Sequence, residues 1–216
     1  MTRFLDRRKA FELRKQGKSY SQIKKELGMS KSTLSEWLRK YPLTKEQIDA
    51  LRGKSEVRIE KYRETMRLKR QNRFYSYYQR EQKYLLPLTH KELLVAGLFL
   101  YLGEGVKGDN CTVSLNNTDP VVVKFYLKWL IKCLKVSKSK IKVAVHLYED
   151  MDIEKSLRYW SSYLDIPRIQ FIKPYIKKSD RTQIDQKGFG HGTCGLYIYD
   201  IKLKTRISAS IKALTD

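Results

Sequence analysis

One carboxylate in this chain has neighbours that suit it to chemistry. Residues 95–105 read VAGLFLYLGEG, an apolar run that ends in Gly103-Glu104-Gly105. Glycine permits a sharp turn and close backbone approach, so we expect Glu104 at an accessible helix end. Carboxylate oxygens bind hard cations such as Mg²⁺, and a metal or a phosphate could reach Glu104 there. The alternative is a plain helix end with a solvated glutamate.

A second set of polar residues has the spacing of a surface that contacts DNA. They lie between residues 30 and 40, on the side of an expected helix that faces away from its apolar residues. Hydroxyl, carboxylate and cationic groups there can hydrogen bond to base edges and phosphates. The candidates are Ser30, Lys31, Ser32, Thr33, Ser35, Glu36, Arg39 and Lys40. Of these, we expect Ser35 and Arg39 to contact bases or phosphates.

Three helices are needed to position that polar surface. Their apolar residues at helical spacing are Ala10 and Leu13, then Tyr20, Ile23 and Leu27, then Leu34, Trp37 and Leu38. Gly28 suits a turn that needs φ > 0, and Ser30 can cap the third helix. The pattern predicts a helix-turn-helix, although a three-helix bundle of mixed charge that binds no DNA would show the same apolar spacing.

The same stretch resembles the helix-turn-helix of resolvases, transposases and related regulators. The resemblance rests on G-x-S before the second helix, L-G-M-S at the turn and T-L-x-x-W-L in the third helix, within residues 17–38. It covers only the beginning of the chain. It implies binding in the major groove of double-stranded DNA and gives no target sequence.

The composition favours a polyanionic partner. The chain has 45 Lys+Arg against 23 Asp+Glu, a formal net charge of +22. Such a field attracts polyanions, and neutralising phosphates releases counterions. A membrane surface or an acidic protein would also suit this charge, but no apolar run reaches the roughly 18 residues of a membrane span. The N-terminus lacks an apolar signal core, so we expect a cytoplasmic protein. We expect DNA as its partner and no small-molecule substrate.

The cysteines and histidines do not have the spacing of a metal site. Cys111, Cys133 and Cys194 are odd in number and form no C-x-x-C pair, which predicts reduced, mostly structural thiols. His90 and His146 lie far from any partner of ligand spacing, as does His191. Zinc and a disulfide framework are therefore not expected.

The chain is expected to divide into three regions. Residues 1–54 form the helix-turn-helix domain, 55–88 a basic helical linker and 89–216 a second domain, with prolines at 42 and 87 near the boundaries. The linker is one long helix or a pair of helices. Arg67, Lys69, Arg70 and Arg73 make it a candidate second arm on DNA phosphates, and a connector kept soluble by its charges is the alternative.

Alternating signals after residue 87 predict an α+β domain with one sheet covered by helices on one face. Helices are expected at residues 90–102, 119–134, 152–164 and 201–214, and strands at 112–115, 140–148, 168–172 and 193–199. Asp119 before Pro120 is a typical cap and first helical position. Residues 180–191 are polar and glycine-rich, which predicts a loop.

Residues 90–213 resemble the LAGLIDADG homing endonuclease superfamily. The likeness rests on the apolar helix that ends in Gly103-Glu104-Gly105 and on the segment N-N-T-D-P at 116–120 with the helix after it. In that family two such helices pack side by side, and the acid near each helix end holds divalent metal at the scissile phosphates. The resemblance implies a LAGLIDADG-like domain with one mixed sheet and Mg²⁺-assisted phosphodiester hydrolysis, with Glu104 as metal ligand and catalytic residue. It also implies a homodimer, because one copy of the motif is visible.

The chain departs from that pattern in three ways. The family pattern has a small residue five positions before the acid, but this chain has Phe99 there. Its small residues Ala96 and Gly97 lie farther upstream, so the close helix contact is displaced or missing. Glutamate replaces the more usual aspartate, and it still offers oxygen to a hard cation. The other groups of a cleavage site are left open: Asp109 and Asp119 are acids near in sequence, and the lysine is one of Lys107, Lys173 or Lys178.

Two functions remain open on these grounds. One is a sequence-specific DNA-binding endonuclease of the homing type, a Mg²⁺-dependent hydrolase. The other is a non-catalytic transcription regulator that carries a degenerate LAGLIDADG domain. A recombinase or transposase accessory subunit is disfavoured, because no acidic triad or nucleophilic serine context follows the helix-turn-helix.

Overall fold

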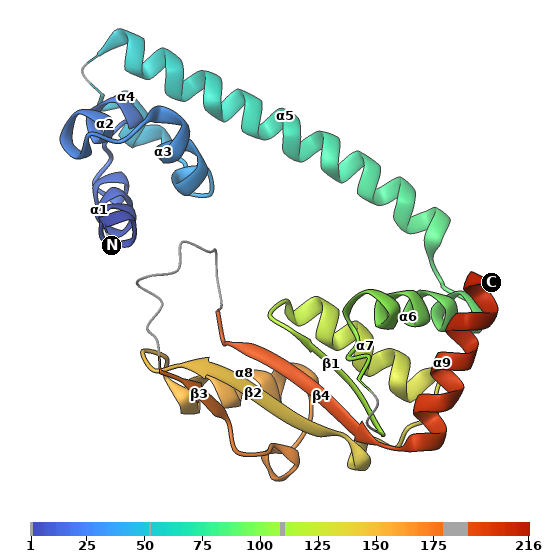
Figure 1. The fold of residues 1–216 in the computed structure, drawn as a ribbon. Coiled ribbons are helices and arrows are strands. Elements are labelled where there is room, and N and C mark those ends of the chain that lie inside the picture. The colour runs from blue at the N-terminus through green and yellow to red at the C-terminus, as the bar shows by residue number, and fades with distance from the viewer. Residues whose placement is uncertain (1, 52, 109–110, 179–189) are drawn as a thin grey trace. The chain divides into compact units, whose positions relative to one another are not determined.

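The computed structural model describes residues 2–51, 53–108, 111–178 and 190–216, and the chain forms two compact units. The first unit is Met1–Leu86 and the second is Pro87–Asp216. Figure 1 shows the first unit as helices and the second as a sheet with helices. The fold is α+β, as predicted, and each unit is described below by itself.

The first unit begins with three short helices, α1 (Thr2–Lys15), α2 (Tyr20–Leu27) and α3 (Lys31–Leu38). The expected turn residues are in place: Gly28 has φ 66°, and the Ser30 side chain accepts a hydrogen bond from the Thr33 amide. Ser19 and Gln22 form a capping box at the start of α2. The predicted helix-turn-helix geometry is confirmed.

Two further helices complete the first unit. The short α4 (Lys45–Asp49) starts at the Thr44 cap. Gly53 precedes α5 (Lys54–Leu85), a single helix of 32 residues rather than a pair. Four tyrosines in its second half are at least half exposed: Tyr75, Tyr77, Tyr78 and Tyr84.

The described residues of the second unit form one four-stranded mixed sheet in the order β1-β4-β2-β3. Its strands are β1 (Thr112–Asn117), β2 (Lys142–Tyr148), β3 (Tyr175–Lys177) and β4 (Thr193–Tyr199). Its α-helices are α6 (His90–Glu104), α7 (Pro120–Lys132), α8 (Ile153–Leu164) and α9 (Ile201–Thr215). Strand β4 is antiparallel to both β1 and β2, whereas β2 and β3 are parallel.

The alternation of side chains along the strands puts the core on one face of the sheet. Val113, Leu115, Val143, Val145, Cys194 and Leu196 point to that face and are buried with residues of the four helices. Trp129 and Trp160, from α7 and α8, are fully buried there. The opposite face carries most of the polar positions of the same strands. In the described parts of the chain the helices pack on the core face, which agrees with the predicted one-sided cover.

Glycine at position 97 allows close packing between α6 and α7. A Cβ atom there would lie 2.0 Å from the Trp129 ring, and Trp129 Nε1 donates to the Leu94 carbonyl at 3.1 Å. Gly97, which lies upstream of the expected position, thus permits a close contact between α6 and α7 within the same unit. Phe99, at the expected position, is 51% exposed.

One predicted strand is wrong. Residues 168–172 form a 3₁₀ turn, η2 (Arg168–Gln170), and contribute only an isolated bridge from Phe171 to Val143. Gln170 explains the turn, because its side-chain amide donates to the Lys138 and Ile141 carbonyls at 2.8 and 2.7 Å. The strand beside β2 comes later, as β3. Most of the predicted loop at 180–191 lies outside the described residues.

Among the described residues, no single helix is both long and apolar enough to cross a membrane, although α5 and α6 taken together as a bent pair meet that criterion.

Candidate nucleic-acid interface

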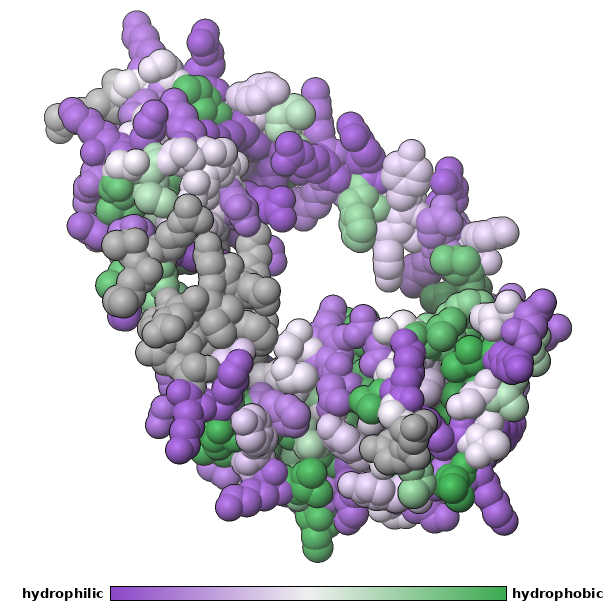
Figure 2. Space-filling model, viewed as in Figure 1, coloured by the Kyte–Doolittle hydropathy of each residue, from purple (hydrophilic) through white to green (hydrophobic). Residues whose placement is uncertain are grey.

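Helix α3 has one buried side and one exposed side. Leu34, Trp37 and Leu38 pack against residues of α1 and α2 in the small core of the first unit. Lys31, Ser32, Ser35, Glu36, Arg39 and Lys40 are exposed. Hydrophilic side chains cover most of the visible surface of this unit, shown purple in Figure 2. The arrangement gives α3 an exposed polar side of the kind that enters a groove of DNA.

Two of the predicted contact residues have a structural task at the start of α3. The Ser30 hydroxyl accepts from the Thr33 amide at 3.1 Å and lies 2.7 and 2.8 Å from the hydroxyls of Ser32 and Thr33. Capping satisfies amides that the first helical turn would otherwise leave unpaired. Ser30 and Thr33 therefore stabilise the N-terminal end of α3, whereas Ser35 and Arg39 lie on its exposed side.

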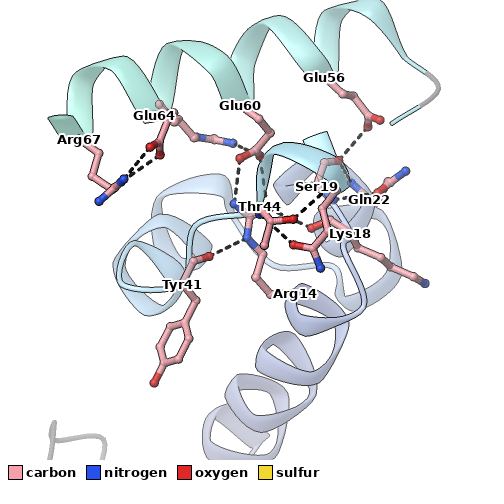
Figure 3. Close-up of polar contacts among 12 residues, drawn as sticks. Arg14, Lys18, Ser19, Gln22, Tyr41, Thr44, Glu56, Glu60, Glu64 and Arg67 are labelled. Carbon is pink, nitrogen blue, oxygen red and sulfur yellow. Dashed lines mark hydrogen bonds and ion pairs between the residues drawn. The ribbon is translucent and has the colours of Figure 1, made fainter. Parts of the chain in front are cut away.

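Helix α5 is fixed to the helix-turn-helix by acids on successive turns. Glu56 accepts from the Ser19 hydroxyl at 2.9 Å, and Glu60 accepts from Arg14 Nη2 at 2.8 Å (Figure 3). Glu60 also accepts from Arg63 at 2.8 Å. The Arg14 and Glu60 side chains are 4% and 3% exposed. Such a buried bidentate pair fixes geometry, because neither charge can be left alone without a large desolvation cost.

Tyr20 lies between two guanidinium groups in the same contact. Arg14 and Arg63 are 4.5 and 3.9 Å from its ring centroid, a cation–π arrangement. Burial raises the pKa of the Tyr20 hydroxyl, and the two arginines oppose that rise. This cluster of Arg14, Tyr20, Glu60 and Arg63 was not found from the sequence. The signal that could have found it is the spacing of Glu56, Glu60 and Glu64 at every fourth residue of a basic helix.

A groove of about 400 Å³ lies between α3 and α5. Ser35 and Arg39 contribute to one wall. The charged groups of the lining are five arginines, Arg14, Arg39, Arg63, Arg67 and Arg70, and two glutamates, Glu60 and Glu64.

The predicted arm residues on α5 differ in their surroundings. Arg67 donates to Glu64 at 2.9 and 2.6 Å, and this hydrogen bonding holds the pKa of the Glu64 carboxyl below its usual value. Arg70 lines the groove and is exposed. Lys69 and Arg73 are exposed and are not among the residues that line it.

In the second unit the structure brings the two sequence motifs together. Glu104 is exposed at the last position of α6, and Asn117 Nδ2 donates to its carboxylate at 3.3 Å. The Asn117 side-chain oxygen accepts from the Asp119 amide at 2.8 Å, and Asp119 caps α7 through Val121. Gly105 is required here, since a Cβ atom would lie 2.5 Å from the Tyr101 carbonyl and ring.

Lys204 is the lysine that contacts this turn. Its ammonium donates to the Val106 carbonyl at 2.6 Å and to the Tyr101 hydroxyl at 2.8 Å. The sequence-based candidates Lys107, Lys173 and Lys178 are exposed, and no ion pair joins them to Glu104 in the described parts of the chain. Asp109 lies outside the described residues. Within the described residues, no group of three or more His, Cys, Asp and Glu side chains could hold a metal ion.

The polar face of the sheet is a second candidate surface, which the sequence did not reveal. The positions on it are Lys142, His146 and Tyr148 of β2, Tyr175 and Lys177 of β3, Tyr197 and Tyr199 of β4, and Asn116 of β1. Tyr175 and Tyr199 are 62% and 69% exposed. Aromatic rings and cations on strands suit bases and phosphates. The alternation at 142–148 and 193–199 was the available signal.

Comparison with known proteins finds a similarity in the first part of the chain. Residues 1–52 match a homeodomain-like domain family. This match supports a helix-turn-helix DNA-binding region. In domains of this kind the third helix contacts bases in the major groove. No curated protein and no solved structure was found to match the chain.

Proposed function

We propose that this protein binds double-stranded DNA of a particular sequence through α3 of its homeodomain-like domain. The observation that carries the proposal is the pairing of a buried side, Leu34, Trp37 and Leu38, with an exposed polar side on one short helix. A duplex groove accepts an α-helix of this kind, and side chains on its open side reach base edges.

Alanine at both Ser35 and Arg39 tests this proposal. A binding site is first selected from a random duplex library with the full chain. We expect the double variant to lose sequence preference, because each good base contact contributes about 1–3 kcal/mol of discrimination. The readout is affinity for the selected duplex against a scrambled one. Unchanged discrimination, with the fold intact by circular dichroism, would show that α3 is not the reading helix.

We further propose that the second unit is a LAGLIDADG-like domain with endonuclease activity. The contact of Glu104 with Asn117, and of Asn117 with Asp119, supports it, because these residues carry the two halves of the resemblance. An exposed carboxylate fits Mg²⁺, which is commonly bound by one or two carboxylates together with substrate phosphates. Glu104 would hold the ion, which supplies Lewis-acid stabilisation of charge on the phosphate oxygens.

In this proposal a second copy of the chain supplies the second carboxylate. An apolar surface on α6 and α9 supports a homodimer. Leu98, Phe99, Leu102, Ile211 and Leu214 line a shallow cleft there. Phe99 and Leu214 are about half exposed. In Figure 2 hydrophobic residues, in green, gather where these two helices lie. Light scattering of the purified chain measures the oligomeric state.

Glu104→Gln tests the proposed activity. With Mg²⁺ we expect the wild-type chain to nick or cut its selected duplex, and the variant to bind the duplex but not cut it, because the amide is a far weaker ligand than the carboxylate. Calcium in place of Mg²⁺ serves as a control for binding. Equal cleavage by the variant would remove Glu104 from the site. No cleavage by wild type would favour the alternative, a non-catalytic transcription regulator.

A further inference from the structure

The groove between α3 and α5 has an excess of positive charge that the protein itself does not neutralise. Three of its five arginines are bound to its two glutamates. Arg39 on the α3 side and Arg70 on α5 remain, and within the described residues neither makes an ion pair. Both are exposed, so each guanidinium is available to an anion outside the protein.

The position of the groove beside α3 suggests which anion that is. A helix in the major groove of DNA is flanked on each side by a phosphate strand, since the groove is only about 12 Å wide. Ser35 and Arg39, on the open side of α3, also line the groove toward α5. A strand that borders the major groove would therefore pass between α3 and the first half of α5.

We infer that the groove between α3 and α5 holds one phosphate strand of the bound duplex, with Arg39 and Arg70 on its two sides. The inference rests on the proposed DNA binding by α3 and adds the place of the backbone. Guanidinium groups suit this role, because their planar N–H donors match the geometry of phosphate oxygens. The groove's net positive charge favours an anionic occupant over a cationic one.

The anchoring of α5 makes Arg70 part of the reading domain rather than of a loose connector. Glu56 and Glu60 fix the helix to Ser19 and Arg14, two to four turns before Arg70 on the same helix. A cation held in place before binding loses less side-chain and segmental freedom when the phosphate arrives. Arg67 is bound to Glu64 in the free protein. Its guanidinium would reach the phosphate strand only when that ion pair opens.

Salt titration of the full chain tests the inference. The probe is a fluorescein-labelled duplex of mixed sequence, and anisotropy gives the dissociation constant at several salt concentrations. We expect Arg70→Ala to lower the magnitude of the log–log salt slope by about 0.9, the value for one phosphate contact. Arg58→Ala is the matched control, since Arg58 is an exposed arginine of α5 that does not line the groove. Its effect should be clearly smaller.

Glu64→Gln adds a variant that should gain affinity. Loss of the carboxylate releases Arg67 toward the strand, so we expect tighter binding and a steeper salt slope. Equal slopes for Arg70→Ala and Arg58→Ala, or weaker binding by Glu64→Gln with the fold intact by circular dichroism, would overturn the inference. These results leave the role of α3 standing as long as Ser35→Ala reduces the discrimination between the selected and the scrambled duplex. Failure of the wild-type chain to bind the duplex would instead overturn the proposed function.

Discussion

The three cysteine side chains differ in exposure, and their reactivity should differ with it. Cys111 is exposed, whereas Cys133 and Cys194 are buried in the core of the second unit. Burial raises the pKa of both buried thiols, that of Cys194 strongly. The thiolate is the reactive form, so a raised pKa and a closed core both protect these two side chains.

Brief alkylation of the native chain at mildly alkaline pH should therefore modify Cys111 alone. Mass spectrometry of the digested protein identifies the labelled residues, and alkylation in denaturant provides the control in which all three react. Labelling of Cys194 as fast as Cys111 in the native chain would show that the sheet core opens readily.

At the scale of elements, the buried Arg14–Glu60 ion pair is a main contact that attaches α5 to the preceding helices. Glu60→Ala leaves Arg14 buried without its carboxylate, although Arg14 still donates to the Tyr41 and Lys18 carbonyls at 3.0 Å. Breaking a buried pair by removing one partner costs about 3–5 kcal/mol. We expect a loss of that order in the stability of the first unit, measured by hydrogen exchange of amides in α1 and α2, which separates it from the second unit.

Glu64→Ala is the matched control for this prediction. It removes the same side chain one turn later, but its pair with Arg67 is partly exposed and lies within one helix. Such pairs contribute at most about 0.5 kcal/mol. Similar losses for the two variants would mean that the Arg14–Glu60 contact does not fix α5.

At the scale of the whole molecule, the net charge of +22 dominates encounters with other macromolecules. Both parts contribute, since residues 1–89 have 24 basic and 10 acidic side chains and the remainder has 21 and 13. We expect affinity for a mixed-sequence duplex to fall at least about tenfold between low and physiological salt, because several phosphates are neutralised at once. Anisotropy against salt concentration measures it, and a flat curve would rule out phosphate contacts as the main attraction.

Local signals were sufficient for most elements. Gly28 and Ser30 predicted the turn and the cap of α3, since backbone conformation and capping depend on a few neighbouring residues. Asp119 and Pro120 predicted the start of α7 in the same way. The strand expected at 168–172 failed, because Gln170 binds carbonyls about 30 residues away and its segment is held in a turn.

The sequence by itself determined the helix-turn-helix, the exposed residues of α3 and the basic character of the chain, because spacing and charge are properties of neighbouring residues. Tertiary structure alone decided which side chains meet. Arg14 binds Glu60, which lies 46 positions away in the sequence. The motifs at Glu104 and Asn117 come into contact only when α6 packs beside β1. Contacts of this kind depend on how buried surfaces fit, which no local pattern specifies.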